Sequence, residues 1–529
     1  MGRGYEDAIA ALNSLQSNFS VVNAIRKAGP GMNLQAIPEM VEWCRKIGYQ
    51  PSDLNRLNLI HIAGTKGKGS TCAFISYILR QYLPSSSSAP DASQTPPPKL
   101  SKIGLYTSPH LRFVRERIQI NNEPLTEPQF AKYFFEIWDR LESSAKSANL
   151  DPADPSTKPV YFRFLTLMAF HAYLCEGVNA AIIECGIGGE YDTTNIIDKP
   201  VVTGITSLGI DHQSMLGDTI EEIAWHKAGI MKPGTKAFTA PQPQPAMEVL
   251  RKRAAEKGAD LTVATGHPEL TAGNPTAIRL GLSGEFQYRN ANLAASVAAS
   301  FLRSRGVPDI PDDDDLTSSP LPQKFKQGLE STKLGGRCEK RVEKNIAWHI
   351  DGGHTLDSIE ATGKWFASQS QSQSQPSSTT TNTTTATPTP RILIFNQQTR
   401  DSVGLARALH STLASSSSPS STTTTPTFTH AIFCTNVTFS QAGYRPDLVS
   451  INTNASDVET LSVQKTLASA WKELSPVTEV RAVGTIEEAV REVRGIAGEV
   501  GGEGEVQVLV TGSLHLVGGL LEVLETMGG

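Results

Sequence analysis

The sequence predicts an α/β fold in two domains, each built on a mostly parallel sheet. Short apolar runs rich in β-branched residues alternate with segments of helical periodicity, the pattern of sheets whose parallel strands are joined by helices. One apolar run, which includes Leu59, Ile60 and Ile62, passes through a glycine-rich turn into a helical segment. At 529 residues the chain is also long enough for more than one hydrophobic core.

Composition narrows the class of protein. The formal net charge is −5 and charged residues make up 19%, so the chain has no basic field of the kind that binds nucleic acid. The six cysteines are scattered without C-x-x-C spacing, which argues against a zinc site or a disulfide framework and favours a reducing compartment. No run has the length of a transmembrane helix, and the N-terminus lacks both an apolar signal core and an arginine-rich presequence. We therefore expect a cytoplasmic protein without an integral membrane segment, with a mitochondrial form or mitochondrial association as the alternative.

The first 100 residues read as a helical lead-in followed by the glycine turn. Apolar residues recur at helical spacing between Tyr5 and Tyr49, a segment expected to pack on the first domain. The stretch from Ser85 to Pro98 is too poor in apolar residues to fold and is predicted to be a surface insertion.

The glycine turn predicts a phosphate-binding loop. Gly64, Gly67 and Gly69 allow backbone N–H groups to curl around an anion, Lys68 adds a positive charge, and Ser70 stands at the start of a helix whose positive end faces the same point. The spacing differs from the standard G-x-x-x-x-G-K-[ST], because Gly69 separates the lysine from the hydroxyl. A strand-to-helix turn that merely needs glycine is the alternative. A nucleotide phosphate is the occupant that the loop favours.

Polar residues close three further strands and suggest a metal site. Ser108 precedes a proline after one strand, Glu184 ends the buried strand Ala180–Ile183, and His212 follows the strand Val201–Leu208. Ligands bind beyond the carboxyl ends of parallel strands, where oxygen and imidazole donors can hold Mg²⁺ beside phosphates. An ordinary turn serine, which is the simpler interpretation of Ser108 alone, and a capping carboxylate at Glu184 are the alternatives.

Two residues within helical segments have two interpretations each. Lys227 has apolar neighbours, among which a lysine loses its charge more easily; a helix-end lysine that faces the helix dipole is the alternative. His171 lies in the apolar helix Tyr161–Leu174 and is interpreted as a hydrogen-bonded core histidine rather than a ligand.

A second α/β domain is predicted over residues 335–529, after a first domain over 1–334. Arg337 precedes a strand that ends at Asp351, and a helix follows Gly352-Gly353-His354. Later strands are predicted at Ile392–Phe395, Ala431–Cys434 and Val506–Val510. Two serine- and threonine-rich tracts, 368–390 and 414–426, are predicted to be disordered insertions.

Seven segments together resemble the folylpolyglutamate synthase family, relatives of the Mur peptide ligases. They occur in family order and cover essentially the whole chain apart from the insertions; they are GTKGKGS, YTSPHL, YFRFLTLMAF, ECGIGGEYDTTNII, GIDHQSMLGDTIEEIAWHKAGI, DGGHTLDS and VTGSLHLVGG. The opening ALNSLQSN is similar to eukaryotic members and favours folylpolyglutamate synthase over dihydrofolate synthase. The resemblance implies a phosphate-loop nucleotide-binding domain followed by a smaller Rossmann-like domain.

The resemblance also implies an activity and roles for residues. ATP would phosphorylate the γ-carboxylate of a reduced folate, and free L-glutamate would attack the acyl phosphate to form an amide. Lys68, Lys227 and His354 match catalytic positions of the family, and Lys227 matches a lysine that is carbamylated in many relatives. The nucleotide-contacting positions are Gly64, Thr65, Lys66, Gly67, Lys68, Gly69, Ser70, Asn290, Arg337 and Asp351, and the metal positions are Ser108, Glu184, His212 and Lys227.

The implied cofactors are ATP and Mg²⁺, with a monovalent cation such as K⁺ as an optional addition, and the family is usually monomeric. Departures from the family pattern occur at Phe286, where many relatives have histidine, and at Gly353, where alanine is commoner. Dihydrofolate synthase, a phosphoryl transferase or ATPase that uses the same loop, and a nucleotide-binding regulatory protein remain the competing hypotheses.

Overall fold

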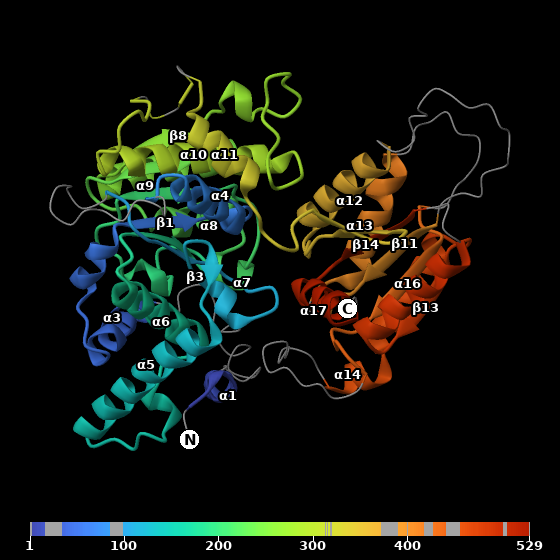
Figure 1. The fold of residues 1–529 in the computed structure, drawn as a ribbon, viewed down its shortest axis with the longest axis horizontal. Helices are drawn as coiled ribbons and strands as arrows, with labels where there is room; N and C mark the ends of the chain where they lie inside the picture. Colours follow the sequence, from blue (N-terminus) through green and yellow to red (C-terminus); the bar gives the residue numbers. More distant parts are fainter. Residues whose placement is uncertain are drawn as a thin grey trace. The chain divides into compact units, whose positions relative to one another are not determined.

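The computed structural model contains two compact units. Unit 1 comprises Met1–His110, Val114–Gly281 and Glu285–Lys333, and unit 2 comprises Leu111–Phe113, Leu282–Gly284 and Leu334–Gly529 (Figure 1). The structure describes residues 3–15, 34–84, 99–312, 314, 316–317, 320–371, 390–398, 400–416, 427–440, 455–500 and 505–527. The main division falls between Lys333 and Leu334, and two short segments from the first half of the chain group with unit 2.

Unit 1 is built on an eight-stranded sheet in the order β4-β3-β2-β5-β1-β6-β7-β8. Neighbouring strands from β2 to β8 are parallel, whereas β3 pairs antiparallel with both β2 and β4. The strands are β1 (Leu59–Ala63), β2 (Ile103–Tyr106), β3 (Ile118–Ile120), β4 (Glu123–Pro124), β5 (Ala180–Glu184), β6 (Val202–Ile205), β7 (Lys236–Thr239) and β8 (Asp260–Val263). All five residues of β1 are buried, because the strand is central and covered on both faces.

Helices cover both faces of the unit 1 sheet. One face packs on α4 (Lys68–Arg80) and α10 (Phe286–Ser304), and α11 (Gln323–Ser331) packs beside α4 (Figure 1). The other face packs on α1 (Tyr5–Ser14), α3 (Ala36–Lys46), α5 (Glu127–Ser147), α6 (Tyr161–Glu176), α8 (Ile220–Ala228) and α9 (Gln244–Lys257). Shorter elements are α7 (Gln213–Leu216) and the 3₁₀ helices η1 (Pro51–Leu57), η2 (Val114–Arg117), η3 (Pro155–Thr157), η4 (Thr193–Ile196) and η5 (Pro268–Leu270).

Local sequence explains where these helices begin and end. A capping box opens α5, in which Thr126 accepts a hydrogen bond from the Gln129 amide, and another opens α8, from Thr219 and Glu222. Helix α6 ends at Gly177, whose φ of +70° is a left-handed conformation that glycine adopts without strain. Helices α5 and α8 therefore start, and α6 stops, for reasons that the chain encodes locally.

Unit 2 is a second α/β layer structure, on a six-stranded sheet in the order β13-β12-β11-β14-β10-β9. All neighbours are parallel except β9 with β10. The strands are β9 (Glu339–Glu343), β10 (Ile346–Ile350), β11 (Arg391–Phe395), β12 (His430–Cys434), β13 (Glu479–Val483) and β14 (Val506–Thr511). One face packs on α16 (Ile486–Val500) and α17 (Leu514–Met527), and the other on α12 (Leu356–Gln371), α13 (Ser402–Ser415) and α15 (Ser462–Leu474); α14 (Ala455–Thr460) precedes α15.

The predicted fold class is confirmed, and some predicted boundaries are corrected. Residues 368–371 continue α12 and residues 414–415 continue α13, so these positions are helical rather than parts of insertions. The remainder of both tracts, apart from residues 390 and 416, and the stretch 85–98 lie outside the described residues.

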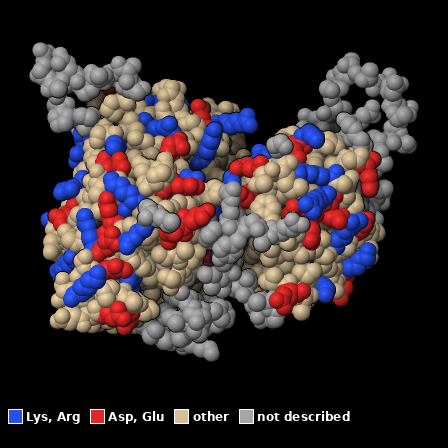
Figure 2. All heavy atoms as spheres, turned by 60° about the horizontal axis from the view of Figure 1, so that its bottom comes forward, with Lys and Arg blue, Asp and Glu red and all other residues tan. Residues whose placement is uncertain are grey.

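Three further sequence-based expectations can be compared with the structure. All six cysteines are free thiols. Across the described ranges, no helix combines the length and apolar character needed to span a bilayer. On the face in Figure 2, acidic and basic side chains are interspersed on each unit, as the small net charge leads one to expect.

The central strand of unit 2 contains a buried histidine that predicts acid sensitivity. His349 on β10 is fully buried between Trp365 and Phe366, and neither of its ring nitrogens has a hydrogen-bond partner among the described residues. Burial lowers the pKa of His349 to about 4. The unfolded chain would protonate this residue near pH 6.5, so between about pH 6.5 and 4 the unfolded state holds more protons and stability falls as pH falls.

We expect His349→Phe to reduce this acid destabilisation, by up to about 1.4 kcal/mol per pH unit across that window, while retaining the ring contacts. Thermal unfolding midpoints of wild type and variant between pH 7.5 and 4.5 measure the effect. Parallel pH profiles for the two proteins would contradict the assignment.

Candidate functional site

The glycine loop lies at the carboxyl end of the central strand of unit 1. Strand β1 pairs with β5 on one side and β6 on the other, and α4 begins at Lys68 directly after the loop. Gly64 and Gly67 have φ values of +148° and +90°. A Cβ on Gly64 would lie 1.8 Å from Thr206 Oγ1, and one on Gly67 would lie 2.2 Å from Asn290 Oδ1. Both positions therefore require glycine for conformation and for space.

Part of the loop is held by hydrogen bonds to the segment that follows β6, the strand next to β1 in the sheet. The amides of Thr65 and Lys66 both donate to the Ser207 carbonyl oxygen at 3.0 Å, and Lys68 Nζ donates to the Gly64 carbonyl oxygen at 3.1 Å. These two amides are thus engaged within the protein. The first turn of α4, from Lys68 onward, supplies N–H groups that no carbonyl within the helix accepts. These groups form the positive end of the helix. The anion-binding capacity of the loop therefore resides mainly in the start of α4 and the Lys68 ammonium.

Helix α10 supports the loop through an amide pair. Asn290 Nδ2 donates to Gln287 Oε1 at 2.9 Å, and Gln287 Nε2 donates to Ser70 Oγ at 3.3 Å. The predicted residues Asn290 and Ser70 are thereby joined through Gln287, which is not among the predicted site residues. The sequence could have indicated Gln287, because it precedes Asn290 by three residues, and residues three apart lie on the same face of a helix.

The predicted metal residues lie at the carboxyl ends of three strands of the same sheet, β2, β5 and β6. The Ser108 amide donates to Glu184 Oε2 at 3.0 Å, and Glu184 is only 3% exposed. His212 follows β6, on the far side of β1, and is an exposed residue in a left-handed conformation with φ 54° at the start of α7. Ser108 and Glu184 are therefore in direct contact, and His212 belongs to the same carboxyl edge.

Asp211 is a further residue of this edge that the predicted set omitted. Its carboxylate pairs with Lys66 Nζ at 3.1 Å and accepts the His212 amide at 2.9 Å. This pair ties the glycine loop to the segment that carries His212. It depends on β6 lying next to β1, which the local sequence does not specify.

Lys227 is buried near the loop lysine. The residue is 2% exposed near the end of α8. Burial, followed by the positive charge of Lys68, lowers the pKa of Lys227 to about 7. The structure thus agrees with the interpretation of Lys227 as a lysine in apolar surroundings. With a pKa of about 7, a substantial fraction of its amine is neutral near neutral pH.

The loop after β5 explains why Lys227 is enclosed. A Cβ on Gly189 would lie 2.5 Å from the His226 carbonyl oxygen, and the Glu190 amide donates to that same oxygen at 2.7 Å. Buried Asp192 braces the loop by accepting from the Ile187 amide at 2.8 Å and from Thr194 Oγ1 at 2.6 Å. The glycines of this segment allow its backbone to cover the end of α8.

The predicted residues of unit 2 cluster around the end of β10. Asp351 is buried, and its carboxylate accepts from the Cys338 amide at 2.9 Å, the Gly353 amide at 2.8 Å and Thr362 Oγ1 at 2.6 Å. Arg337 Nη1 donates to the Gly336 carbonyl oxygen at 3.4 Å. Asp351 therefore braces this loop, and its predicted contact with the nucleotide stays a prediction.

His354 has a defined ring orientation. Its Nδ1 lies 2.8 Å from the Gly352 carbonyl oxygen, an acceptor, so Nδ1 carries the proton and Nε2 is the basic nitrogen of the neutral ring. The backbone amides of His354 and Thr355 both donate to Ser358 Oγ, which caps the start of α12.

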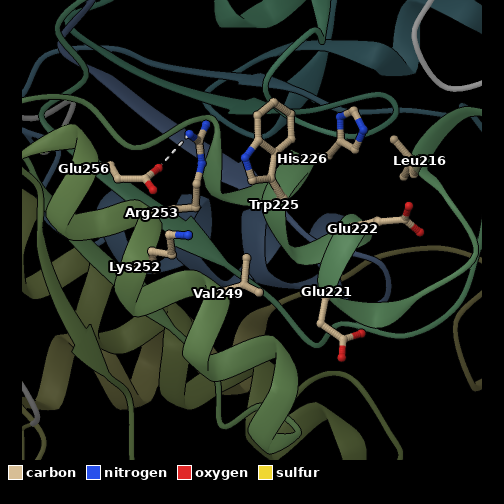
Figure 3. Close-up of a pocket in the computed structure, with 9 residues that line it drawn as sticks. All are labelled: Leu216, Glu221, Glu222, Trp225, His226, Val249, Lys252, Arg253 and Glu256. Atoms are coloured by element: carbon tan, nitrogen blue, oxygen red, sulfur yellow. Dashed lines mark hydrogen bonds and ion pairs between the residues drawn. The ribbon is translucent and has the colours of Figure 1, made fainter.

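A groove of about 380 Å³ lies between α8 and α9, but its lining does not suit phosphate (Figure 3). Arg253 stacks on Trp225 at 4.4 Å and is paired with Glu190 and Glu256, and Glu222 caps α8. None of the predicted phosphate or metal residues lines this groove. The glycine loop remains the candidate site.

The strand–glycine loop–helix at a parallel sheet edge, with a buried acid and a buried lysine in the same unit, defines an α/β protein of the phosphate-loop class. The chain is 44% identical over 524 residues to a folylpolyglutamate synthase of Neurospora crassa, across 99% of this chain and 92% of that protein. It therefore belongs to the folylpolyglutamate synthase family. No protein-family model matches the sequence.

Solved structures agree on the fold. A Mycobacterium tuberculosis folylpolyglutamate synthase complexed with ADP and AMPPCP superposes with a TM-score of 0.64 at 22% identity, covering 99% of each chain. An FPGS–AMPPCP–folate complex superposes with a TM-score of 0.59 at 21% identity, covering 97% of this chain and 100% of that one.

The close approach at Gly64 gives a testable prediction. Gly64→Ala should destabilise the protein by more than Gly177→Ala, which also has a positive φ but has nothing within 4 Å of its Cβ position. The control should cost about 1 to 2 kcal/mol from conformation alone, and Gly64→Ala should add the clash with Thr206. Denaturant unfolding of both variants measures the difference, and equal losses would show that Thr206 does not constrain the loop.

Proposed function

We propose that this chain is an ADP-forming ligase that adds L-glutamate to the γ-carboxylate of a reduced folate or folylpolyglutamate. The observation that most strongly supports this proposal is the 44% identity with a folylpolyglutamate synthase over 99% of the chain. A carboxylate oxygen attacks the γ-phosphorus of ATP and releases ADP. The glutamate amine then attacks the acyl carbon, inorganic phosphate leaves, and the amine loses a proton.

The glycine loop supports the phosphate-binding step. We assign the ATP phosphates to the N-terminal turn of α4 and to Lys68, whose Nζ lies over the loop carbonyl of Gly64. From α10, Gln287 donates to Ser70 at the start of α4 and accepts from Asn290, which supports the loop. Fixed positive groups at this point favour the charge that spreads over the transferring phosphoryl group.

The carboxyl edge carries a donor set that suits Mg²⁺. Glu184 is an almost fully buried carboxylate, and Ser108, whose amide it accepts, carries a hydroxyl on the same segment. Ser108, Glu184, His212 and a carbamylated Lys227 would hold the ion, which supplies positive charge to the phosphates when bound. A neutral Lys227 amine is the form that reacts with CO₂, and the lowered pKa favours that form.

Unit 2 contributes further groups to the proposal. Arg337 and Asp351 are assigned to the nucleotide, with Asp351 acting through the loop that it braces. His354, with Nε2 as the basic nitrogen, is assigned to the reacting groups. An optional K⁺, a monomeric state, and a cytoplasmic location with a mitochondrial alternative complete the proposal.

Comparison of acceptors tests the proposed activity. Purified protein with ATP, Mg²⁺ and glutamate should extend tetrahydrofolate by one or more glutamates and release one phosphate for each bond formed. Preference for dihydropteroate would indicate dihydrofolate synthase, and glutamate-independent phosphate release would indicate an ATPase. Lys68→Ala should reduce ligation by at least about 100-fold, because a phosphate-binding cation is lost; unchanged ligation would refute the role of Lys68.

Replacement of Lys227 separates stability from activity. The folded pKa of about 7 lies below the unfolded value of about 10.4, so the buried lysine destabilises the fold most at and below pH 7, and stability rises with pH between these values. Lys227→Met should therefore stabilise the protein at pH 7 by about 1 to 3 kcal/mol in bicarbonate-free buffer, with a gain that shrinks toward pH 10. The same variant should lose ligation.

Lys252→Met, on the exposed face of α9, is the matched control and should change neither property. Thermal unfolding at several pH values and the ligation assay measure the two effects. An active Lys227→Met protein would exclude a role for this lysine in the reaction.

A further inference from the structure

A second cluster of chemically reactive side chains lies on the helical layer of unit 1, away from the glycine loop. Glu136 projects from α5, and His171 and Cys175 project from α6. One ligand atom from each residue can be chosen so that all three lie within 4.8 Å of one another. None of the three belongs to the proposed ligase site.

The geometry around His171 is well defined. The ring is fully buried, with Nε2 at 2.6 Å from Glu136 Oε2 and Nδ1 at 2.8 Å from the Tyr49 hydroxyl. Cys175 follows one helical turn later on the same face of α6, with Sγ 3.8 Å from His171 Nε2. The interpretation of His171 as a hydrogen-bonded core histidine is thus confirmed; its Nε2 is directed at Glu136, and the Cys175 sulfur lies at nearly equal distances from both ring nitrogens.

Access to the cluster is open from one side. Cys175 is exposed and the Glu136 side chain is 37% exposed, whereas His171 lies beneath them. A cation arriving from solvent would therefore meet the thiol and carboxylate first and the imidazole last.

We propose that Glu136, His171 and Cys175 form a binding site for a thiophilic divalent cation of the Zn²⁺ class. One carboxylate oxygen, one imidazole nitrogen and one thiolate are donors that Zn²⁺ prefers, and three protein ligands plus water is a common coordination. The cation replaces the proton between Nε2 and Oε2, and that contact widens by roughly 0.7 Å to reach the usual ligand separation. The thiol proton leaves to solvent, and the proton on the imidazole moves to Nδ1.

Tyr49 fits the supporting role that such a site requires. A metal-bound imidazole usually donates its other N–H to a neighbouring acceptor, which fixes the ring. The Tyr49 hydroxyl lies at the required position and can accept from Nδ1–H after the exchange. Because the ring already has two partners without metal, the fold does not depend on the cation, and binding is reversible.

Neighbouring charges set the strength of binding. Lys132 and Arg140 lie four residues before and after Glu136 on α5, and both act on His171 and Cys175. They disfavour an added cation. Burial and the neighbouring Glu136 raise the pKa of the Cys175 thiol, and the two cations act against that rise. We therefore expect a site that fills at micromolar metal rather than a permanently occupied structural site.

Cobalt titration tests the proposal. Co²⁺ added to the full chain in excess Mg²⁺ should bind with one equivalent that shows thiolate-to-cobalt charge-transfer absorption, and Zn²⁺ should abolish this absorption. Ligands at the proposed magnesium site include no thiolate, so that site does not give the signal. Cys175→Ser should lose the band while retaining wild-type ligation.

Glu136→Gln should weaken cobalt binding by about tenfold or more, and Glu142→Gln, on the same helix outside the cluster, should bind as wild type. Absence of the band in wild type, or its persistence in Cys175→Ser, would overturn the proposal. The Glu136 variant keeps the thiol, so the conclusion stands on two independent ligands.

Discussion

The close approach of the glycine loop to its neighbours is the constraint on which the candidate site depends. Gly64 touches the exit of β6, and Gly67 touches α10, at distances that leave no space for a side chain. Through these contacts, the carboxyl end of β1, the start of α4, the segment that follows β6 and helix α10 meet at a single point. The glycines are thus required by packing, and the positive end of α4 is placed by the same packing.

The site carries positive charge that costs stability. Lys227 is buried, and Lys68 is close enough to disfavour its charged form. Such an arrangement would be eliminated if only stability mattered, since burial and a nearby like charge both destabilise an ammonium group. In a ligase that binds phosphates, the positive charge of Lys68 can bind the phosphate oxygens, and a neutral Lys227 amine can react with CO₂. Perturbed lysines of this kind are typical of functional sites.

The sequence predicted the parts of the fold that depend on local pattern. Buried strands such as β1, β5 and β14 read as apolar runs, and Glu184 was placed at a strand end because an acid closed such a run. Strands β9 and β13 were missed, because they lie at the sheet edges and carry several charged residues, so that their sequences resemble loops. Long-range contacts were also missed: the Lys66–Asp211 pair joins residues far apart in the chain, and the bracing role of Asp351 depends on Cys338 and Thr362.

The central claim is that the carboxylate of the acceptor is activated by phosphorylation before the amide forms. Positional isotope transfer tests it most directly. With a tetrahydrofolate labelled with ¹⁸O in its γ-carboxylate, each turnover with ATP and glutamate should place one ¹⁸O atom in the inorganic phosphate released. Phosphate free of ¹⁸O, formed at the same rate as the product, would show that water rather than the carboxylate attacks ATP and would contradict the account.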